Sequence, residues 1–178
     1  MALGTRPAPR ALWTSCSRPS ELLRTVEFVD TSVLCNFLDV PGKNQDRDEV
    51  RKSMRQKVDG GVQLIIPISA VVEAGNHITQ LRDGAARRAC AERFATTLRA
   101  IAAGELPWVL HQVAWDEQFL VKLCDGVAGT GPFVECATQG LGAGDLAILV
   151  ERELYLERSA IERAGVWTLD AQLAAYAQ

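Results

Sequence analysis

Residues 26–39 have the sequence VEFVDTSVLCNFLD, in which a short apolar run ends directly on an aspartate. The run VEFV has the length and the β-branched and aromatic composition of a buried strand. Asp30 follows it in place of the usual glycine or proline turn, and a helical pattern begins at Thr31. The stretch therefore predicts a buried strand that passes directly into a helix, with an acid at the junction.

The same alternation of apolar runs and helical patterns continues along the chain. Further strands are predicted at residues 62–66 (VQLII), 108–113 (WVLHQV) and 166–169 (VWTL). One helix is predicted to stop at Gly104 and another to run from Asp145 to Gly165. Apolar runs this continuous indicate strands covered on both faces. We therefore predict an α/β fold, a single domain with a parallel sheet flanked by helices.

Composition favours one compact domain and gives little indication of a partner. The chain has 178 residues, 48% of them hydrophobic, which is enough for a substantial core. Its net charge of −3 creates no long-range attraction for nucleic acid. The five cysteines lack the spacing of a disulfide framework or a zinc site, and no apolar run has the roughly 18 residues of a membrane span. We expect a soluble, cytoplasmic protein.

Residues 1–25 differ in composition from the rest of the chain. They contain three prolines, and four arginines against a single acid, Glu21, and they show no periodic pattern. We expect a disordered leader or a misassigned start codon rather than a transit peptide. The folded domain is then predicted to span residues 26–178.

Four acids occupy related places in this alternation: Asp30 and Asp170 end the first and fourth strands, Asp145 opens a helix after GLGAG, and Glu73 lies about one turn into a helix. Strand carboxyl ends and the following helix starts lie at one edge of a parallel sheet, so these side chains can converge there. Clustered carboxylates repel one another unless a cation is present. Mg²⁺ and Mn²⁺ are hard ions that take such oxygen ligands, so the pattern favours a metal site.

Helix capping is the alternative explanation for the three aspartates. Aspartate is among the best N-cap residues, and each of the three stands before a helical pattern. Glu73 alone would be explained as a solvated helix residue. Because asparagine caps about as well as aspartate, capping predicts that exchange of each Asp for Asn is nearly silent. The recurrence of an acid at the one edge where four could cluster favours the metal site.

The segments VEFVDTSVL, ISAVVEAGNHI, GAGDLAIL and VWTLD resemble, in this order, the four acidic motifs of PIN domains. The branch they resemble most is the VapC-type toxin ribonuclease of bacterial toxin–antitoxin pairs. The resemblance implies a three-layer fold and a metal-dependent endoribonuclease that hydrolyses single-stranded RNA. It also implies a homodimer and a small antitoxin partner. Catalysis and metal binding would belong to Asp30, Glu73, Asp145 and Asp170, with polar support from Thr31, Ser32, Asn76 and Thr168.

Two features depart from the PIN pattern. Many PIN domains continue into a further edge strand, whereas this chain ends eight residues after Asp170, which predicts one strand fewer or a trimmed chain. The segment 114–144 is also long, and three of its acids compete with Asp145 for the third position: Asp116, Asp125 and Glu135. Asp145 is preferred because a glycine-rich stretch precedes it and an apolar helix follows.

Basic residues that could attract RNA are concentrated in two helical stretches. The first contains Arg47, Arg51, Lys52, Arg55 and Lys57, and the second contains Arg82, Arg87, Arg88 and Arg93. Two solvated helix faces are the alternative explanation. Of the two histidines, His111 is expected to be structural, and His77 is expected to pack or cap locally rather than bind phosphate.

Two other functions remain as alternatives. A phosphatase of the haloacid dehalogenase type also begins with a strand followed by aspartate, but it needs D-x-D where this chain has DTS. The second alternative is a PIN-like interaction module that has lost its metal, and the presence of all four acids counts against it.

Overall fold

The computed structural model describes residues 25–177 of the chain, which form four strands and eight helices. The strands are β1 (Val26–Val29), β2 (Gln63–Ile66), β3 (Trp108–Leu110) and β4 (Ala164–Trp167). The helices are α1 (Thr31–Phe37), α2 (Arg47–Asp59), α3 (Ile68–Thr79), α4 (Gly84–Ala102), α5 (Glu117–Asp125), α6 (Phe133–Thr138), α7 (Ala143–Arg158) and α8 (Ala171–Ala174). The predicted leader, up to residue 24, lies outside the described residues.

All strand pairs in the sheet are parallel, and the strand order is β3-β2-β1-β4. Val26 of β1 lies opposite Gln63 on one side and Ala164 on the other. The predicted α/β fold with a parallel sheet flanked by helices is therefore confirmed. The chain moves outward from β1 through β2 to β3 and then returns to β4 on the other side of β1. The crevice at the carboxyl ends of β1 and β4 is thus the topological switch point, where ligands bind in open α/β sheets.

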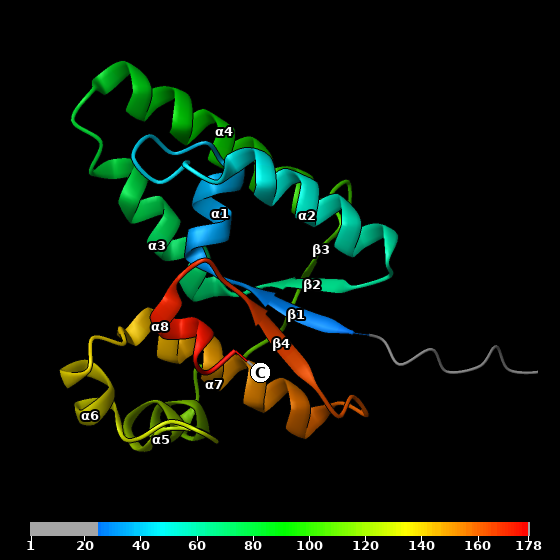
Figure 1. Ribbon diagram of the computed structural model, residues 1–178, viewed down its shortest axis with the longest axis vertical. Helices are drawn as coiled ribbons and strands as arrows, with labels where there is room; N and C mark the ends of the chain where they lie inside the picture. Colours follow the sequence, from blue (N-terminus) through cyan, green and yellow to red (C-terminus); the bar gives the residue numbers. More distant parts are fainter. Residues whose placement is uncertain (1–24, 178) are drawn as a thin grey trace, which may run out of the picture.

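Helices cover both faces of the sheet, so the fold has three layers (Figure 1). Helices α1 to α4 lie on one face, where Val29, Leu64 and Ile66 enter the core. Helices α5 to α8 lie on the other, where Phe28 and Ile65 are buried. Each face of the sheet packs against helices, which explains why the strands are mainly apolar, with Glu27 and Gln63 as exceptions in β1 and β2.

Element boundaries differ from the predicted ones at one helix and three strands. The second strand begins at Gln63 rather than at residue 62, and the fourth spans Ala164–Trp167 rather than 166–169, so Thr168 and Leu169 follow it. The helix predicted from Asp145 to Gly165 begins at Ala143 and ends at Arg158, because Ser159 adopts an extended backbone, and Gly165 lies inside β4. The third strand ends at Leu110, so His111 lies beyond it. In contrast, β1 matches its predicted range, and α4 stops at Ala102 before Gly104, which has a φ of 71°.

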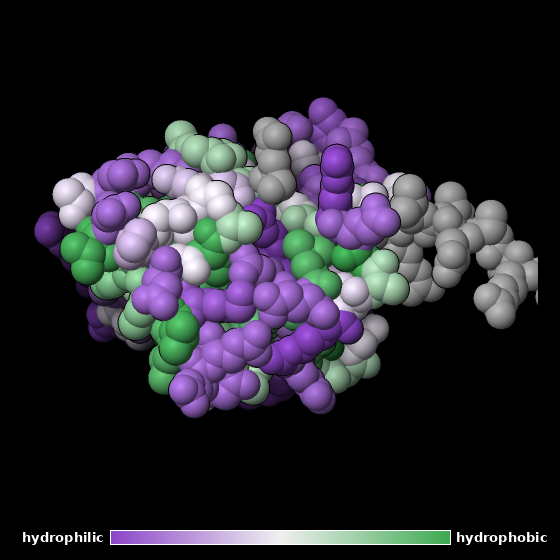
Figure 2. All heavy atoms as spheres, turned by 90° about the horizontal axis from the view of Figure 1, so that it is seen from below, coloured by the Kyte–Doolittle hydropathy of each residue, from purple (hydrophilic) through white to green (hydrophobic). Residues whose placement is uncertain are grey.

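The surface on the side of α5, α6 and α7 mixes hydrophilic and hydrophobic residues (Figure 2). Its exposed apolar side chains include Trp115, which stacks on Phe119 with ring centroids 5.2 Å apart, and Val134. None of the helices in residues 25–177 has the length and apolar character needed to cross a membrane.

Candidate functional site

Asp30 is the buried N-cap residue of α1 and is 2% exposed. Oδ1 accepts a hydrogen bond from the Thr31 N–H at 2.5 Å, and Oδ2 accepts from the Ser32 N–H at 3.1 Å and the Ser32 hydroxyl at 2.5 Å. Oδ2 also accepts from the Thr168 hydroxyl at 2.8 Å. Because donors engage both oxygens, an asparagine amide would face at least one N–H or O–H group. The hydrogen bonds therefore predict that asparagine does not replace this cap silently at Asp30.

The loop after β4 is fastened to the start of α1 by the same hydroxyl groups. Besides its bond to Asp30, the Thr168 hydroxyl accepts the Asp170 N–H at 2.9 Å, and the Ser32 hydroxyl accepts the Leu169 N–H at 3.0 Å. The Asp30 N–H donates to the carbonyl of Trp167 at 3.0 Å. These contacts hold the carboxyl ends of β1 and β4 together, so Asp30 and Asp170 lie at the same edge of the sheet.

Asp170 is exposed and is the N-cap residue of α8. Its Oδ1 alone accepts the N–H groups of Gln172 at 2.7 Å and Leu173 at 3.2 Å. Capping is thus confirmed for Asp30 and Asp170. For Asp170, unlike Asp30, an asparagine oxygen could accept both bonds, so exchange for Asn would isolate the loss of charge.

Glu73 extends from α3 to the start of two other helices. The Thr31 hydroxyl of α1 donates to its Oε2 at 2.7 Å. At Gly144 in α7, an added Cβ would lie 2.7 Å from the carboxyl carbon of Glu73, so a side chain there would displace the Glu73 carboxylate. The absence of a side chain at Gly144 therefore lets the Glu73 carboxylate lie against the first turn of α7. This gives the glycine before Asp145 a structural role that the sequence pattern alone did not define.

Asp145 is the third residue of α7 rather than its N-cap residue, so the predicted N-cap position is wrong, although its side chain still caps the start of the helix. Its Oδ2 accepts the N–H of Gly142, the N-cap residue, at 3.1 Å. Burial raises the pKa of Asp145 to about 6; the Gly142 N–H opposes this rise, and the negative charges of Asp30, Glu73 and Asp170 add to it. The other three predicted acids thus all lie within electrostatic reach of Asp145.

The four carboxylates nevertheless do not form a closed coordination site for an ion. Within residues 25–177, no three His, Cys, Asp or Glu side chains are close enough to hold one ion together. Mg²⁺ usually takes one or two carboxylates directly and retains several waters. The donor set, with its mutual repulsion at Asp145, fits a hydrated ion of this kind better than an ion enclosed by the protein.

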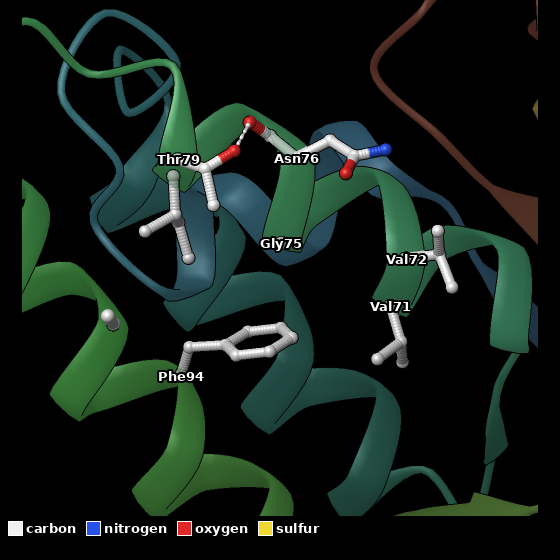
Figure 3. A pocket seen from close by; sticks show the side chains of 8 residues that line it. Val71, Val72, Gly75, Asn76, Thr79 and Phe94 are labelled. Carbon is white, nitrogen blue, oxygen red and sulfur yellow. Dashed lines mark hydrogen bonds between the residues drawn. The ribbon is translucent and has the colours of Figure 1, made fainter.

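Three of the four predicted supporting residues donate a hydroxyl hydrogen bond to an acid. Thr31 donates to Glu73, and Ser32 and Thr168 donate to Asp30. Asn76 does not, since the structure records no side-chain hydrogen bond from it to any of the four acids. Asn76 instead lies among the residues that line the groove between α3 and α4 (Figure 3). That groove has a volume of about 360 Å³ and is lined mainly by apolar side chains, including Val71, Val72 and Phe94.

The competing acids of the long segment lie on α5 and α6. Asp116 caps α5 by accepting the Phe119 N–H at 3.0 Å, Asp125 is the last residue of α5, and Glu135 lies in the first turn of α6. None of these three acts on the pKa of Asp145, whereas the other three predicted acids do. This favours Asp145 for the third position.

Several predicted RNA-attracting cations are engaged in structural contacts. Lys57 pairs with Glu27 at 2.6 Å, Arg47 with Asp39 at 3.1 Å and Arg88 with Glu92 at 2.9 Å. Arg93 donates to the backbone carbonyls of Leu38 and Asp39, both at 3.0 Å, and so holds α4 against the end of α1. These four basic residues contribute to folding contacts.

Sequence reasoning missed one cation near the acids, Lys43. It is exposed in the loop between α1 and α2, and no helical periodicity marks it. Burial lowers the pKa of His77, the charge of Lys43 lowers it further, and Glu73 opposes both effects. Lys43 and Glu73 therefore both lie near His77, one turn beyond Glu73 on α3.

Comparison of the chain with protein-family models, with curated proteins and with solved structures finds no match. These comparisons therefore assign neither a family to the chain nor a role to the acids, and the PIN-domain resemblance stays a prediction.

Proposed function

We propose that this protein is a metal-dependent endoribonuclease that hydrolyses single-stranded RNA, and that it is the toxin of a toxin–antitoxin pair. The observation that carries the proposal is the convergence of Asp30, Glu73, Asp145 and Asp170 at the switch point of a parallel sheet, with the pKa of Asp145 raised to about 6. A bound cation would stabilise a cluster with this much negative charge. RNA phosphates would bring further negative charge to the same place.

The four acids are the residues that would hold Mg²⁺ or Mn²⁺. When bound, such an ion polarises a phosphoryl oxygen and makes a coordinated water more acidic. The chain itself orients the carboxylates. The Thr31 hydroxyl fixes Glu73, and the Ser32 and Thr168 hydroxyls fix Asp30. Two carboxylates that cannot rotate freely lose less entropy when they bind an ion.

Substrate binding would depend on local charge because the whole chain carries −3. Lys43 is the cation that we propose for a phosphate near the acids, since it is exposed and its charge reaches His77 beside Glu73. His77 itself stays neutral at pH 7 under this proposal, because burial and Lys43 lower its pKa.

A protein partner is supported by exposed apolar side chains. Ile68, Val72 and Leu110 are 48%, 56% and 62% exposed, and Val72 also lines the groove between α3 and α4. A small antitoxin and a second copy of the chain are the partners that we propose. Expression in bacterial cytoplasm should then slow growth, and coexpression of the antitoxin should relieve it.

The direct test uses the purified full chain with single-stranded and duplex RNA, in EDTA, Mg²⁺ or Mn²⁺. We expect cleavage only with the ion and only of single strands. Asp170→Asn should abolish it. The matched control is Asp83→Asn at the cap of α4, where Oδ1 likewise accepts two N–H groups, those of Ala85 and Ala86.

Each alternative function has its own outcome in this test. Unchanged cleavage in both Asp170→Asn and Asp83→Asn would mean that capping explains both residues. Hydrolysis of a phosphomonoester without RNA cleavage would favour the phosphatase. If the folded wild type cleaves no RNA, either in EDTA or with Mg²⁺ or Mn²⁺, the interaction module would be favoured.

A further inference from the structure

One exposed apolar side chain lies beside the acids, and the proposed chemistry does not use it. Leu169 follows β4, stands between Thr168 and Asp170 in the chain, and is 43% exposed. A single exposed leucine is common on protein surfaces. Leu169 differs from such a residue because hydrogen bonds to the acid site fix the loop that carries it.

The backbone of Leu169 is tied to the buried cap of α1. Its N–H donates to the Ser32 hydroxyl at 3.0 Å, and that hydroxyl donates to Oδ2 of Asp30 at 2.5 Å. On either side of Leu169, the Asp170 N–H donates to the Thr168 hydroxyl at 2.9 Å, and this hydroxyl donates to Asp30 at 2.8 Å. The loop therefore cannot move away from Asp30 without breaking these bonds.

The register of the sheet places Leu169 in the crevice where a ligand is expected. Val29 lies opposite Trp167, so β1 and β4 end level with each other. Asp30 and Thr168 are the next residues of the two segments, and Leu169 comes one residue later. It thus lies at the switch point of the sheet, together with Asp30 and Asp170.

The fold itself makes little use of this side chain. Within residues 25–177, Leu169 packs into neither of the two hydrophobic cores, whereas Trp167 packs against one and Leu173 is buried in the other. Its apolar surface stays in water next to carboxylates, and covering that surface with a ligand would be favourable. A rigid backbone adds to this gain, because little order has to be imposed when the ligand binds.

A nucleotide has the chemistry to cover a leucine beside these acids. Its phosphate would lie at an ion held by the acids, and the base attached to the same nucleotide presents an apolar face. Bases of a single strand can leave their stack and contact protein side chains, whereas bases in a duplex remain paired and stacked. We propose that Leu169 is a substrate-contact residue, which packs on the base next to the scissile phosphate and helps to select single strands. The inference deepens the proposed function and rests on it.

The test measures the affinity of the full chain for a single-stranded RNA oligonucleotide in Mn²⁺, and the KM and kcat of its cleavage. Affinity is compared in the Asp170→Asn background, in which the RNA should stay intact. Leu169→Ala should weaken binding and raise KM about fivefold to tenfold, because it removes most of the apolar contact. It should change kcat less than KM, since the four acids are unchanged. Leu169→Phe should bind at least as tightly as leucine, because an aromatic ring stacks on a base. Circular dichroism establishes that each variant is folded.

A second probe separates contact with a base from a general effect on the loop. An abasic oligonucleotide of the same length keeps the sugars and phosphates and lacks the bases. The protein with Leu169 should bind it more weakly than RNA, and Leu169→Ala should bind it as well as the protein with Leu169 does. An equal loss for the abasic oligonucleotide and for RNA would overturn the base contact.

The matched control is Leu120→Ala. Leu120 is 48% exposed, close to the value of Leu169, and lies on α5, which carries none of the four acids. This variant should keep the affinity and the KM of wild type. If wild type cuts RNA but Leu169→Ala binds it as tightly, or loses no more than Leu120→Ala, the inference fails and the proposed function stands. If wild type binds RNA without cutting it, the proposed function fails and the affinity ratios still decide the inference. If wild type binds no RNA, both fail.

Discussion

Exchange of Asp145 for asparagine should stabilise the metal-free protein and weaken its binding of a cation. Only one oxygen of this carboxylate has a hydrogen bond within residues 25–177, from the Gly142 N–H, and an asparagine oxygen can accept it equally well. The substitution therefore keeps the start of α7 and removes a charge that the surrounding acids disfavour.

The expected size of the effect follows from the pKa of Asp145. In the folded protein it is about 6, against an ordinary value of 3.8. The folded state then holds the proton more tightly than the unfolded state, so its stability falls as pH rises from about 4 to about 6 and stays lower above. A difference of about 2 in pKa corresponds to about 3 kcal/mol. Partial exposure of the side chain reduces this to about 1–2 kcal/mol.

Urea unfolding in EDTA at pH 4.5 and pH 8 measures this difference. The advantage of Asp145→Asn over wild type should be smaller at pH 4.5, where the folded state keeps its proton and only the unfolded state has begun to lose it, and should reach about 1–2 kcal/mol at pH 8. The raised pKa of Glu151 contributes to the pH dependence of both proteins and cancels in the comparison. In saturating Mg²⁺ the order should reverse. A variant that is no more stable than wild type at pH 8 would refute the account of repulsion among the acids.

Three further predictions concern the same cluster. Asp30→Asn should cost about 1–3 kcal/mol in urea unfolding because a bond to its oxygens is lost, whereas Asp170→Asn should cost well under about 1 kcal/mol; equal costs would contradict the hydrogen-bond assignment. Gly144→Ala should displace Glu73 and weaken Mn²⁺ binding in a titration, whereas Gly75→Ala, whose Cβ would meet Phe94 at an ordinary 3.7 Å, should leave binding unchanged. Mg²⁺ at 100 times its Kd should add about 2.7 kcal/mol of stability and raise the melting temperature; an identical rise after neutralisation of all four acids would place the ion elsewhere.

The sequence predicted the fold well where local and global signals agree. VEFV is apolar except at Glu27, whose carboxylate pairs with Lys57, and the prediction of β1 matches its observed bounds. The helix from Asp145 was extended too far because SAIERAG continues a helical composition after Arg158. Tertiary pairing with β1 instead makes Ala164–Trp167 a strand, with Gly165 opposite Glu27. Helix propensity is a weak signal that such packing overrides.

The acids were predictable because topology alone brings strand ends and helix starts to one edge. The contacts between individual residues at this edge were not predictable from the sequence. The approach of Glu73 to Gly144 joins residues 71 positions apart, and the pair of His111 with Glu151 joins residues 40 positions apart. Arg93 looked like a surface cation because its bonds to Leu38 and Asp39 depend on how α4 packs on α1. No local sequence pattern predicts these tertiary contacts.

Capping does not account for the charge of the cluster, even though two of its members are caps. Asp30 and Asp170 cap α1 and α8, but a serine, threonine or asparagine caps a helix without bringing a full negative charge. Glu73 and Asp145 are not N-caps, and their charges add to the same repulsion. An arrangement chosen for stability alone would avoid a buried carboxylate beside three others, since it weakens the metal-free fold above pH 6. A bound divalent cation would reverse that effect at these four positions, and this is why the metal-dependent function is the proposal that the geometry favours.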